Sequence, residues 1–521
     1  MKTLMAIDAG TGSVRAVLFD LEGHQLGCVS REWYHKEDKY PGSMNFDWGN
    51  NWELTKECIK GVITQTGADP GEIAAISTTC MREGIVLYDD EGKEIWACAN
   101  VDSRAKEEAE EIITKNPKLE LEVYKKTGQT SALDAIPRLL WIKNKEPDIY
   151  KKISKLTMFN DWLIYKLSGE FYCEPSNAST TGLVNLKLRD WDLDIAKQFD
   201  ISPDIFPKII ESGSLFSKVN KDAALETGLK EGTPIVVGGG DAQLGCIGVG
   251  VVDDFEAAVF GGSFWQYEYN TSSPAIDDKS KVRVNCHAVK NIWQYEAIAF
   301  NPGLIMRWFR DAFCEYEKEE AKKAGRDVYD LMNEKASKVP IGCYGMKCAF
   351  SDIMDYPNWR HAAPAFSNFS LDPEKFNKYT FYRAILENAA LLTRGHIELV
   401  YEQTGNKPEF ITFASGASKS PLWCQILADA TGLEVRVPEV KEATALGAAI
   451  LAGVGVGIYK NVSETAKKLV KISAVYKPDI KNYAVYSDVF ASWKNWYAKE
   501  LEIADLGLTN HMWAAPGSNR R

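Results

Sequence analysis

A strand followed by a turn of glycine and other small residues recurs in this chain, and this recurrence constrains the fold more than any other feature. The first case runs from a strand over residues 4–7, through the turn Asp8 to Ser13, to a strand over residues 14–19. A comparable strand over residues 234–237 precedes three glycines, and strand-like runs follow at 257–260 and 265–269. Because helical patterns alternate with these strands, we predict an α/β fold whose two halves are structural duplicates.

The length of the chain predicts how these halves are organised. At 521 residues the chain is longer than one hydrophobic core usually serves. We therefore predict two domains, residues 1–245 and residues 246–521. A cleft between two domains is the default place for an active site.

The first turn, Asp8 to Ser13, is a candidate phosphate-binding loop. Its backbone N–H groups can converge on phosphate oxygens, and its glycines allow a close approach. Asp8 stands where a hydrated Mg²⁺ needs a carboxylate, because Mg²⁺ keeps several waters and few protein ligands. Arg15 adds positive charge if its side chain points inward. A hairpin turn without a ligand remains the alternative for this pattern.

Two further small-residue turns occur in the second half of the chain. Gly261, Gly262 and Ser263 follow a strand and offer a second phosphate-binding turn. The segment 415–418, which includes Gly416, lies between a strand-like run and a helix that starts near Pro421. An adenine or ribose could approach it, although this pattern alone carries little weight.

Asp241 is the candidate catalytic base. Phosphoryl transfer needs an acceptor for the proton of the attacking hydroxyl, and Asp241 follows a strand and three glycines. Capping of the next helix is the alternative role for this residue. Arg82 and Glu83 follow a strand in the first half and suit a polyhydroxy or carbonyl substrate. A surface ion pair is the alternative for them.

Several other chemistries lack their sequence signals. Arg15 stands where a dinucleotide-binding G-x-G-x-x-G needs its third glycine, and no P-loop, histidine metal motif or G-x-S-x-G elbow occurs. A net charge of −11 opposes binding to nucleic acid. The eleven cysteines form no CxxC pair, which suits a reducing compartment. No signal peptide or bilayer span is evident, so we expect a cytoplasmic protein with no membrane partner.

With these loops identified, the sequence resembles the FGGY family of carbohydrate kinases, which belongs to the superfamily sharing the actin and Hsp70 nucleotide-binding fold. The resemblance covers nearly the whole chain. It rests on MAIDAGTGSVRAVLFD, VVGGGDAQLGCIG, FGGSFW, FASGASKSPLWCQILADATG and EATALGAAILAG, in that order. It implies a two-domain, actin/Hsp70-like (ribonuclease H-like) duplicated fold with a central cleft, and a kinase that uses ATP and Mg²⁺.

The resemblance also assigns roles to individual residues. Asp241 matches the catalytic base of the family. The residues implied to face the phosphates of Mg-ATP are Asp8, Gly10, Thr11, Gly12 and Ser13, with Gly261 and Gly262 opposite them and Gly416 near the adenosine. The residues implied to line the acceptor pocket are Arg82, Glu83, Asp102, Gln243 and Trp265. Two positions depart from the family pattern, because Arg138 replaces a lysine and Ser415 replaces a glycine.

The acceptor is the least constrained part of this interpretation. The segments CMREGIVLYDDEGKEIWACANVDSRA and EPSNASTTGL narrow the resemblance to kinases of a linear dihydroxypentanedione, phosphorylated on its terminal hydroxyl. Xylulose, gluconate and glycerol remain alternative acceptors. A nucleotide-dependent switch without an acceptor, as in actin-like proteins, is the alternative from another class. Regulation by a phosphotransferase-system protein is a further expectation.

Overall fold

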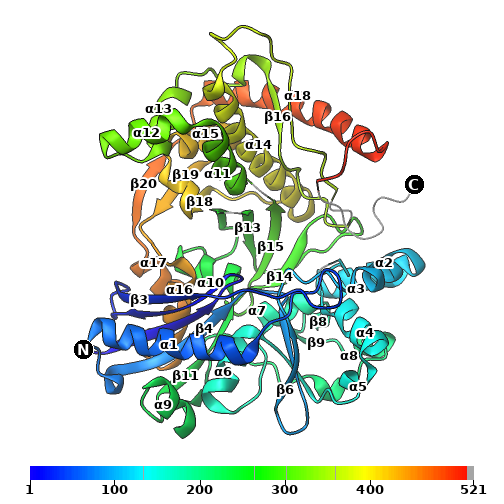
Figure 1. Ribbon diagram of the computed structural model, residues 1–521, viewed down its shortest axis with the longest axis vertical. Helices are drawn as coiled ribbons and strands as arrows, with labels where there is room; N and C mark the ends of the chain where they lie inside the picture. The colour runs from blue at the N-terminus through cyan, green and yellow to red at the C-terminus, as the bar shows by residue number, and fades with distance from the viewer. Residues whose placement is uncertain (133, 263, 301, 358–359, 513–521) are drawn as a thin grey trace. The chain divides into compact units, whose positions relative to one another are not determined.

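The computed structural model describes residues 1–132, 134–262, 264–300, 302–357 and 360–512. These residues form two compact units. The first unit comprises residues 1–254, 270–294 and 440–471, and the second comprises the rest of the chain. The sequence predicted a boundary between residues 245 and 246, whereas the first unit extends to Asp254 and includes two later segments. Figure 1 shows the course of the chain.

A six-stranded sheet forms the centre of the first unit. Strand β1 pairs antiparallel with β2 and parallel with β4, and β11 continues the parallel part. Both edge strands, β3 and β10, pair antiparallel with their neighbours. In order across the sheet, the strands are β10 (Leu215–Lys218), β11 (Pro234–Gly240), β4 (Ile73–Cys80), β1 (Thr3–Ala9), β2 (Ser13–Phe19) and β3 (Gln25–Glu32).

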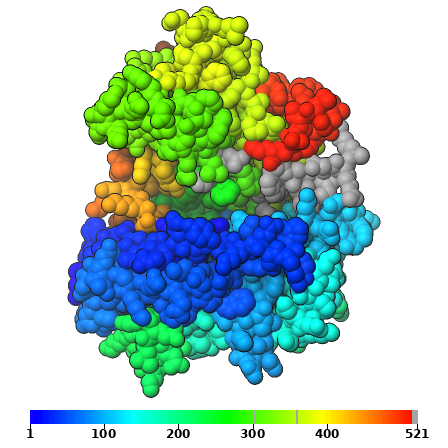
Figure 2. Space-filling view, viewed as in Figure 1, coloured from blue at the N-terminus to red at the C-terminus, as the bar shows by residue number. Residues whose placement is uncertain are grey.

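Strands β1, β4 and β11 are buried along almost their whole length, because helices cover the sheet. Helix α1 (Trp48–Thr66) packs on β2 and β3, and helix α16 (Ala443–Gly455) packs on β1, β4 and β11. The outer side of α1 is visible in Figure 2 as part of the blue surface. Helix α10 (Asp241–Gly248) follows β11 directly and packs closely on α16.

The remaining elements of the first unit extend this core. A three-stranded sheet has the order β6-β5-β7, and β8 and β9 form a short hairpin. The bounds of these strands are β5 (Ile85–Tyr88), β6 (Glu94–Cys98), β7 (Lys155–Met158), β8 (Val184–Asn185) and β9 (Asp190–Trp191). Strand β14 comprises Arg283–Cys286. The other helices are α2 (Lys106–Lys115), α3 (Pro117–Thr127), α4 (Ala135–Lys145), α5 (Pro147–Tyr150), α6 (Phe159–Ser168), α7 (Pro175–Ala178), α8 (Leu193–Gln198), α9 (Lys221–Thr227) and α17 (Val462–Leu469).

The main sheet of the second unit repeats the strand order of the first. Strand β12 pairs antiparallel with β13 and parallel with β18, and β18 pairs parallel with β19. The edge strand β20 is antiparallel to β19. Six of the seven strands of this sheet have the order β15 (Trp293–Ala299), β13 (Trp265–Thr271), β12 (Ala257–Gly261), β18 (Phe410–Ala414), β19 (Glu434–Pro438) and β20 (Ile472–Tyr476). Strands β12, β18 and β19 therefore correspond to β1, β4 and β11.

Helices and a small hairpin complete the second unit. Helix α14 packs on α15 and is capped by Gly405, whose left-handed backbone is typical of a glycine that follows a helix. The hairpin consists of β16 (Lys347–Ala349) and β17 (Ala365–Ser367). The helices are α11 (Pro302–Phe313), α12 (Glu315–Ala324), α13 (Val328–Ala336), α14 (Lys378–Thr404), α15 (Pro421–Thr431) and α18 (Ile480–Asp505). In the described residues, no helix combines the length and apolarity needed to cross a membrane.

Candidate active site

The turn between β1 and β2 is shaped by two side chains that sequence reasoning missed. The indole Nε1 of Trp33 donates to the carbonyls of Gly10 and Thr11, at 3.0 and 3.1 Å. Nε2 of His35 donates to the same Thr11 carbonyl at 2.6 Å, so this nitrogen carries the proton. Because C=O and N–H of a trans peptide point in opposite directions, the N–H groups of Thr11 and Gly12 face away from Trp33. This orientation presents two donors to an anion.

Asp8 is the second-last residue of β1, just before this turn, and is almost fully buried. Burial is the main cause that raises the pKa of its carboxyl to about 7; Arg15 partly offsets this rise, and Asp241 and Glu442 contribute to it. Nε of Arg15 lies 3.5 Å from Oδ2 of Asp8. The influence of Asp241 on Asp8 means that the two predicted acids belong to one electrostatic site in the first unit. A cation beside Asp8 would offset the cost of its burial.

The second acid, Asp241, is the first residue of α10 and follows the glycines that end β11. Its side chain is 42% exposed, and its Oδ1 lies 3.3 Å from Nε of the buried Arg82. A Cβ on Gly240 would lie 2.7 Å from Oε1 of Gln243 and 3.0 Å from Cγ of Arg82. Glycine at position 240 therefore allows Arg82 and Gln243 to approach the backbone beside Asp241.

A buried polar network supports the backbone that carries Asp241. The hydroxyl of Ser176 accepts the N–H of Gly240 at 3.0 Å. Glu174 in turn accepts the N–H groups of Ser176 and Asn177, which fixes the start of α7. Burial raises the pKa of Glu174 to about 7. These residues lie in the EPSNASTTGL segment, but no local signal linked Ser176 to Gly240, because 64 residues separate them.

Two residues of the predicted acceptor pocket are Gln243, two positions after Asp241, and Glu83, which follows the Arg82 that pairs with Asp241. The amide of Gln243 is fully buried, and neither its oxygen nor its nitrogen has a hydrogen-bond partner among the described residues. Glu83 has a positive φ of 62° and accepts from Nη1 of the buried Arg283 at 2.5 Å. A buried, unpaired amide costs folding free energy, so Gln243 is a group that a polar ligand would satisfy.

Asp102 is engaged in a different way. Its two oxygens accept from Nε and Nη2 of Arg104, and Oδ2 also accepts the N–H of Met44 at 2.6 Å. Arg138, where the family pattern has lysine, donates to the carbonyls of Glu83, Asn100 and Asp102. Asp102 and Arg138 therefore organise the loop next to Glu83, and the contacts of the Asp102 side chain are with the protein.

In the second unit, the predicted phosphate turn and the predicted adenosine loop lie together. A Cβ on Gly261 would lie 2.6 Å from Cβ of Ala417, next to Gly416. Ser415 has φ 75° and ψ −166°, a region that is essentially restricted to glycine. This conformation favours glycine, which is the residue that the resemblance implied at position 415. Gly262 ends the same turn, whereas the predicted Ser263 lies outside the described residues.

Trp265, predicted to line the acceptor pocket, lies in the interior of the second unit. Its ring is fully buried and stacks on Trp423 with the ring centroids 5.0 Å apart. Its Nε1 donates to Oγ1 of Thr393 at 2.8 Å. The side chain is therefore satisfied by the core around it.

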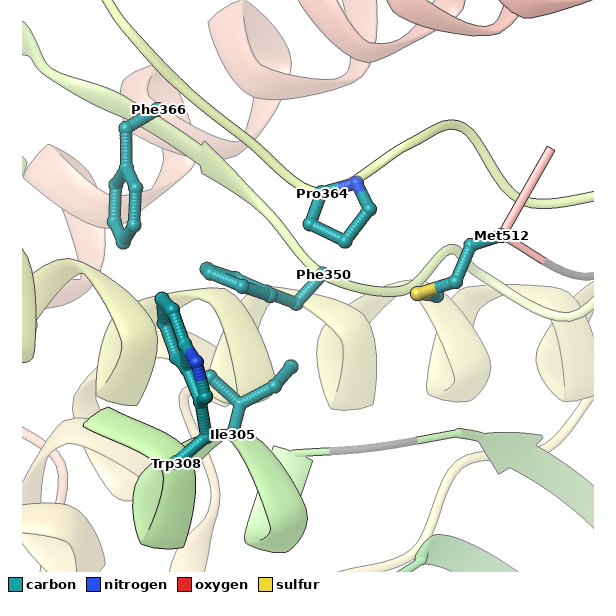
Figure 3. Close-up of a pocket in the computed structure, with 6 residues that line it drawn as sticks. All are labelled: Ile305, Trp308, Phe350, Pro364, Phe366 and Met512. Carbon is teal, nitrogen blue, oxygen red and sulfur yellow. The ribbon is translucent and has the colours of Figure 1, made fainter. Parts of the chain in front are cut away.

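A cavity of about 430 Å³ in the second unit has a different character. Figure 3 shows its apolar walls, which consist of Ile305, Trp308, Phe350, Pro364, Phe366 and Met512. Such a lining offers no carboxylate or cation for phosphoryl transfer. In the residues that the structure describes, no group of three or more His, Cys, Asp or Glu side chains could hold a metal ion by itself.

Comparison with known proteins identifies the family. The N-terminal domain of the FGGY family of carbohydrate kinases matches residues 3–248, and its C-terminal domain matches residues 269–456. Autoinducer-2 kinases from Yersinia enterocolitica and Escherichia coli are 48% and 49% identical over 516 residues. The matches cover 99% of this chain and 98% and 97% of those proteins, respectively.

A solved structure supports the same conclusion at the level of the fold. The xylulose kinase from Rhodospirillum rubrum aligns with a TM-score of 0.84 at 22% identity, over 96% of this chain and 99% of that chain. This similarity confirms the predicted α/β, two-domain kinase fold. Together with the domain matches, it establishes that the chain belongs to the FGGY family of carbohydrate kinases.

Proposed function

We propose that this chain transfers the γ-phosphoryl group of ATP to the terminal 5-hydroxyl of linear 4,5-dihydroxypentane-2,3-dione, the quorum-sensing signal autoinducer-2. The products are phospho-autoinducer-2 and ADP. The observation that carries the proposal is the pairing of Asp241 with Arg82, in the same electrostatic site as Asp8. The acceptor is inferred from the autoinducer-2 kinases that match almost the whole chain.

Asp241 acts in this proposal as the general base. Its exposed carboxylate can accept the proton of the attacking hydroxyl, and the adjacent Arg82 guanidinium stabilises its negative charge. Ser176 fixes the Gly240 N–H and so limits the movement of the residue that follows. Such positioning matters because the attacking oxygen and the leaving oxygen must be in line during transfer.

The turn after β1 binds the phosphates in this proposal. The N–H groups of Thr11 and Gly12 face away from Trp33, and the sequence also predicts contacts from Gly10, Ser13 and Arg15. Mg²⁺, when bound with the nucleotide, supplies positive charge that neutralises the transferring group. The buried Asp8 carboxylate fits such an ion, because few protein ligands and several waters are usual for Mg²⁺. We propose that the second unit contributes Gly261, Gly262 and Gly416.

Recognition of the acceptor is assigned to Arg82, Glu83 and Gln243. The acceptor has adjacent carbonyl and hydroxyl groups, which need both donors and acceptors of hydrogen bonds. Arg82 supplies N–H donors, and Glu83 supplies a carboxylate that accepts. The unpaired amide of Gln243 supplies both a donor group and an acceptor oxygen. Asp102 contributes indirectly, through the loop that it stabilises with Arg104.

A panel of acceptors tests this proposal directly. ADP release is measured with autoinducer-2, xylulose, gluconate and glycerol at saturating Mg-ATP. We expect the highest kcat/KM with autoinducer-2 and a phosphorylated product carrying the group on its terminal oxygen, identified by ³¹P NMR. Faster turnover of a pentulose would show that the proposed acceptor is wrong, while the proposed kinase activity would stand. ATP hydrolysis at full rate without any acceptor would favour a nucleotide-dependent switch instead.

Location and regulation remain predictions from the sequence. None of the eleven cysteines forms a disulfide bond in the described residues, which suits a reducing environment such as the cytoplasm. Control by a phosphotransferase-system protein is tested by adding the phosphorylated and unphosphorylated carrier to the same assay. A change in kcat or KM with only one of the two forms would support this regulation, and no change with either would contradict it.

A further inference from the structure

The two halves of the fold place an acidic residue at equivalent positions. In the first half, β11 leads directly to Asp241 at the start of α10. In the second half, β19 occupies the corresponding place in its sheet, and the chain continues to Glu442 at the N-cap of α16. The two helices pack so closely that a Cβ on Gly447 would lie 2.0 Å from the carbonyl of Leu244. Glu442 is therefore the structural counterpart of the proposed base.

Each of these acids is paired with an arginine of the first unit. Asp241 pairs with Arg82, and Glu442 pairs with Arg15. Nη1 of Arg15 donates to Oε2 of Glu442 at 2.6 Å, whereas Nε of Arg15 lies 3.5 Å from Oδ2 of Asp8. One guanidinium thus stands between two carboxylates, and its short charge-assisted hydrogen bond goes to Glu442.

The position of Arg15 determines what Asp8 can bind. A guanidinium that turned fully onto Asp8 would occupy the oxygens needed by a hydrated Mg²⁺. We propose that Glu442 is a positioning residue that holds Arg15 away from Asp8 and keeps this carboxylate available to the Mg²⁺ of the bound nucleotide. The inference rests on the proposed function, and nothing in the sequence pattern alone assigned this role to Glu442.

A purely structural tie between β2 and α16 is the competing explanation. The side chains of Arg15 and Glu442 are 30% and 28% exposed, and ion pairs that water reaches contribute little to folding. A structural tie would affect thermal stability but not metal affinity. A positioning role would affect metal affinity while leaving the folded protein almost equally stable.

Glu442→Gln separates these explanations, because it removes the charge and preserves the shape of the side chain. Mn²⁺ affinity in the presence of ADP is measured by electron paramagnetic resonance, which requires no turnover. We expect Mn²⁺ affinity to fall about tenfold, because Arg15 loses its charged partner and moves onto Asp8. The Mg²⁺ concentration for half-maximal activity should rise by a similar factor.

Two further variants complete the design. Glu442→Ser also removes the charge but provides a good N-cap for α16, so it protects the fold if the glutamine variant is unstable. Glu57→Gln is the matched control, because Glu57 pairs with Arg31 at 2.9 Å at the surface of the same unit. We expect the serine variant to lose metal affinity like the glutamine variant, and the control to keep it.

The results distinguish this inference from the proposed function. If wild-type protein binds Mn-ADP and phosphorylates its acceptor, unchanged metal affinity in both Glu442 variants overturns the role of Glu442 alone. If wild-type protein binds no Mn-ADP, the proposed function fails and the inference fails with it. Loss of affinity in the Glu57→Gln control as well would also contradict a specific role for Glu442.

Discussion

The turns that follow β1 and β12 occupy the same topological position in two related sheets, yet their surroundings differ. The first is backed by charged groups, with Asp8 buried below it and Arg15 linking Asp8 to Glu442. The second is backed by the aromatic ring of Trp265, which stacks on Trp423. The two halves of the fold therefore contain equivalent turns after β1 and β12, whereas the acids and arginines assigned to the chemistry are concentrated in the first unit.

The largest expected effect concerns the acid after β11. Asp241→Asn keeps the shape of the side chain but removes its ability to accept a proton. We expect kcat to fall by ~10²–10⁴-fold, as is typical for loss of a general base. Nucleotide affinity, measured by calorimetry, should remain close to that of the wild type. Unchanged turnover would show that Asp241 is not the general base. It would also contradict the assignment of the chemistry to acids of the first unit.

Trp265 tests the second side of the comparison. Trp265→Phe removes the N–H that reaches Thr393 and leaves space against Trp423, so the free energy of unfolding should fall by about 2 kcal/mol. Denaturant titration measures this change. Because the ring is internal to the second unit, KM for the acceptor should not change. A large rise in the KM for the acceptor, without a change in the free energy of unfolding, would indicate that Trp265 contacts the acceptor.

Gln243 should show the opposite behaviour. Gln243→Leu replaces a buried amide that has no partner in the described part of the chain, so the thermal midpoint should rise or stay constant. The acceptor KM should increase about tenfold, since the amide is proposed to be satisfied only by the substrate. Paired measurements of stability and KM identify this trade-off. A variant that is both less stable and kinetically normal would indicate a structural role.

The smallest effect is expected at Ser415. Ser415→Gly relieves a backbone conformation that glycine adopts without strain, although glycine also increases the entropy of the unfolded chain. These terms oppose each other, and we expect a net gain in unfolding free energy of about 1 kcal/mol. The affinity for ATP should not decrease. A clear loss of stability would contradict the strain inferred at this position.

Much of the fold was predictable because its signals are local. Small-residue turns next to short apolar strands identified β1, β2, β11 and β12. The start of α1 is harder to place from the sequence. Asn50 and Asn51 are residue types that often cap helices, whereas Asp47 caps the helix by accepting the N–H of Asn50. Any of several nearby polar residues could serve as a cap, and tertiary packing selected one of them.

The support of the site could not be predicted in the same way. The contact between Arg15 and Glu442 joins residues 427 positions apart, and the EATALGAAILAG segment that begins with Glu442 gave no sign of this partner. Trp33 and His35 resemble ordinary core and surface residues in the sequence, yet they orient the phosphate turn. Local patterns therefore indicate candidate residues for the chemistry, while the residues that position these candidates depend on the folded structure.

A crystal structure with a non-hydrolysable ATP analogue, Mg²⁺ and the acceptor tests the central claim most directly. We predict that the acceptor hydroxyl lies about 3 Å from the Asp241 carboxylate. The terminal phosphate of the nucleotide should lie between this hydroxyl and the turn that follows Asp8. A nucleotide whose phosphates are held away from that turn, or an acceptor that has no contact with Asp241, would contradict it.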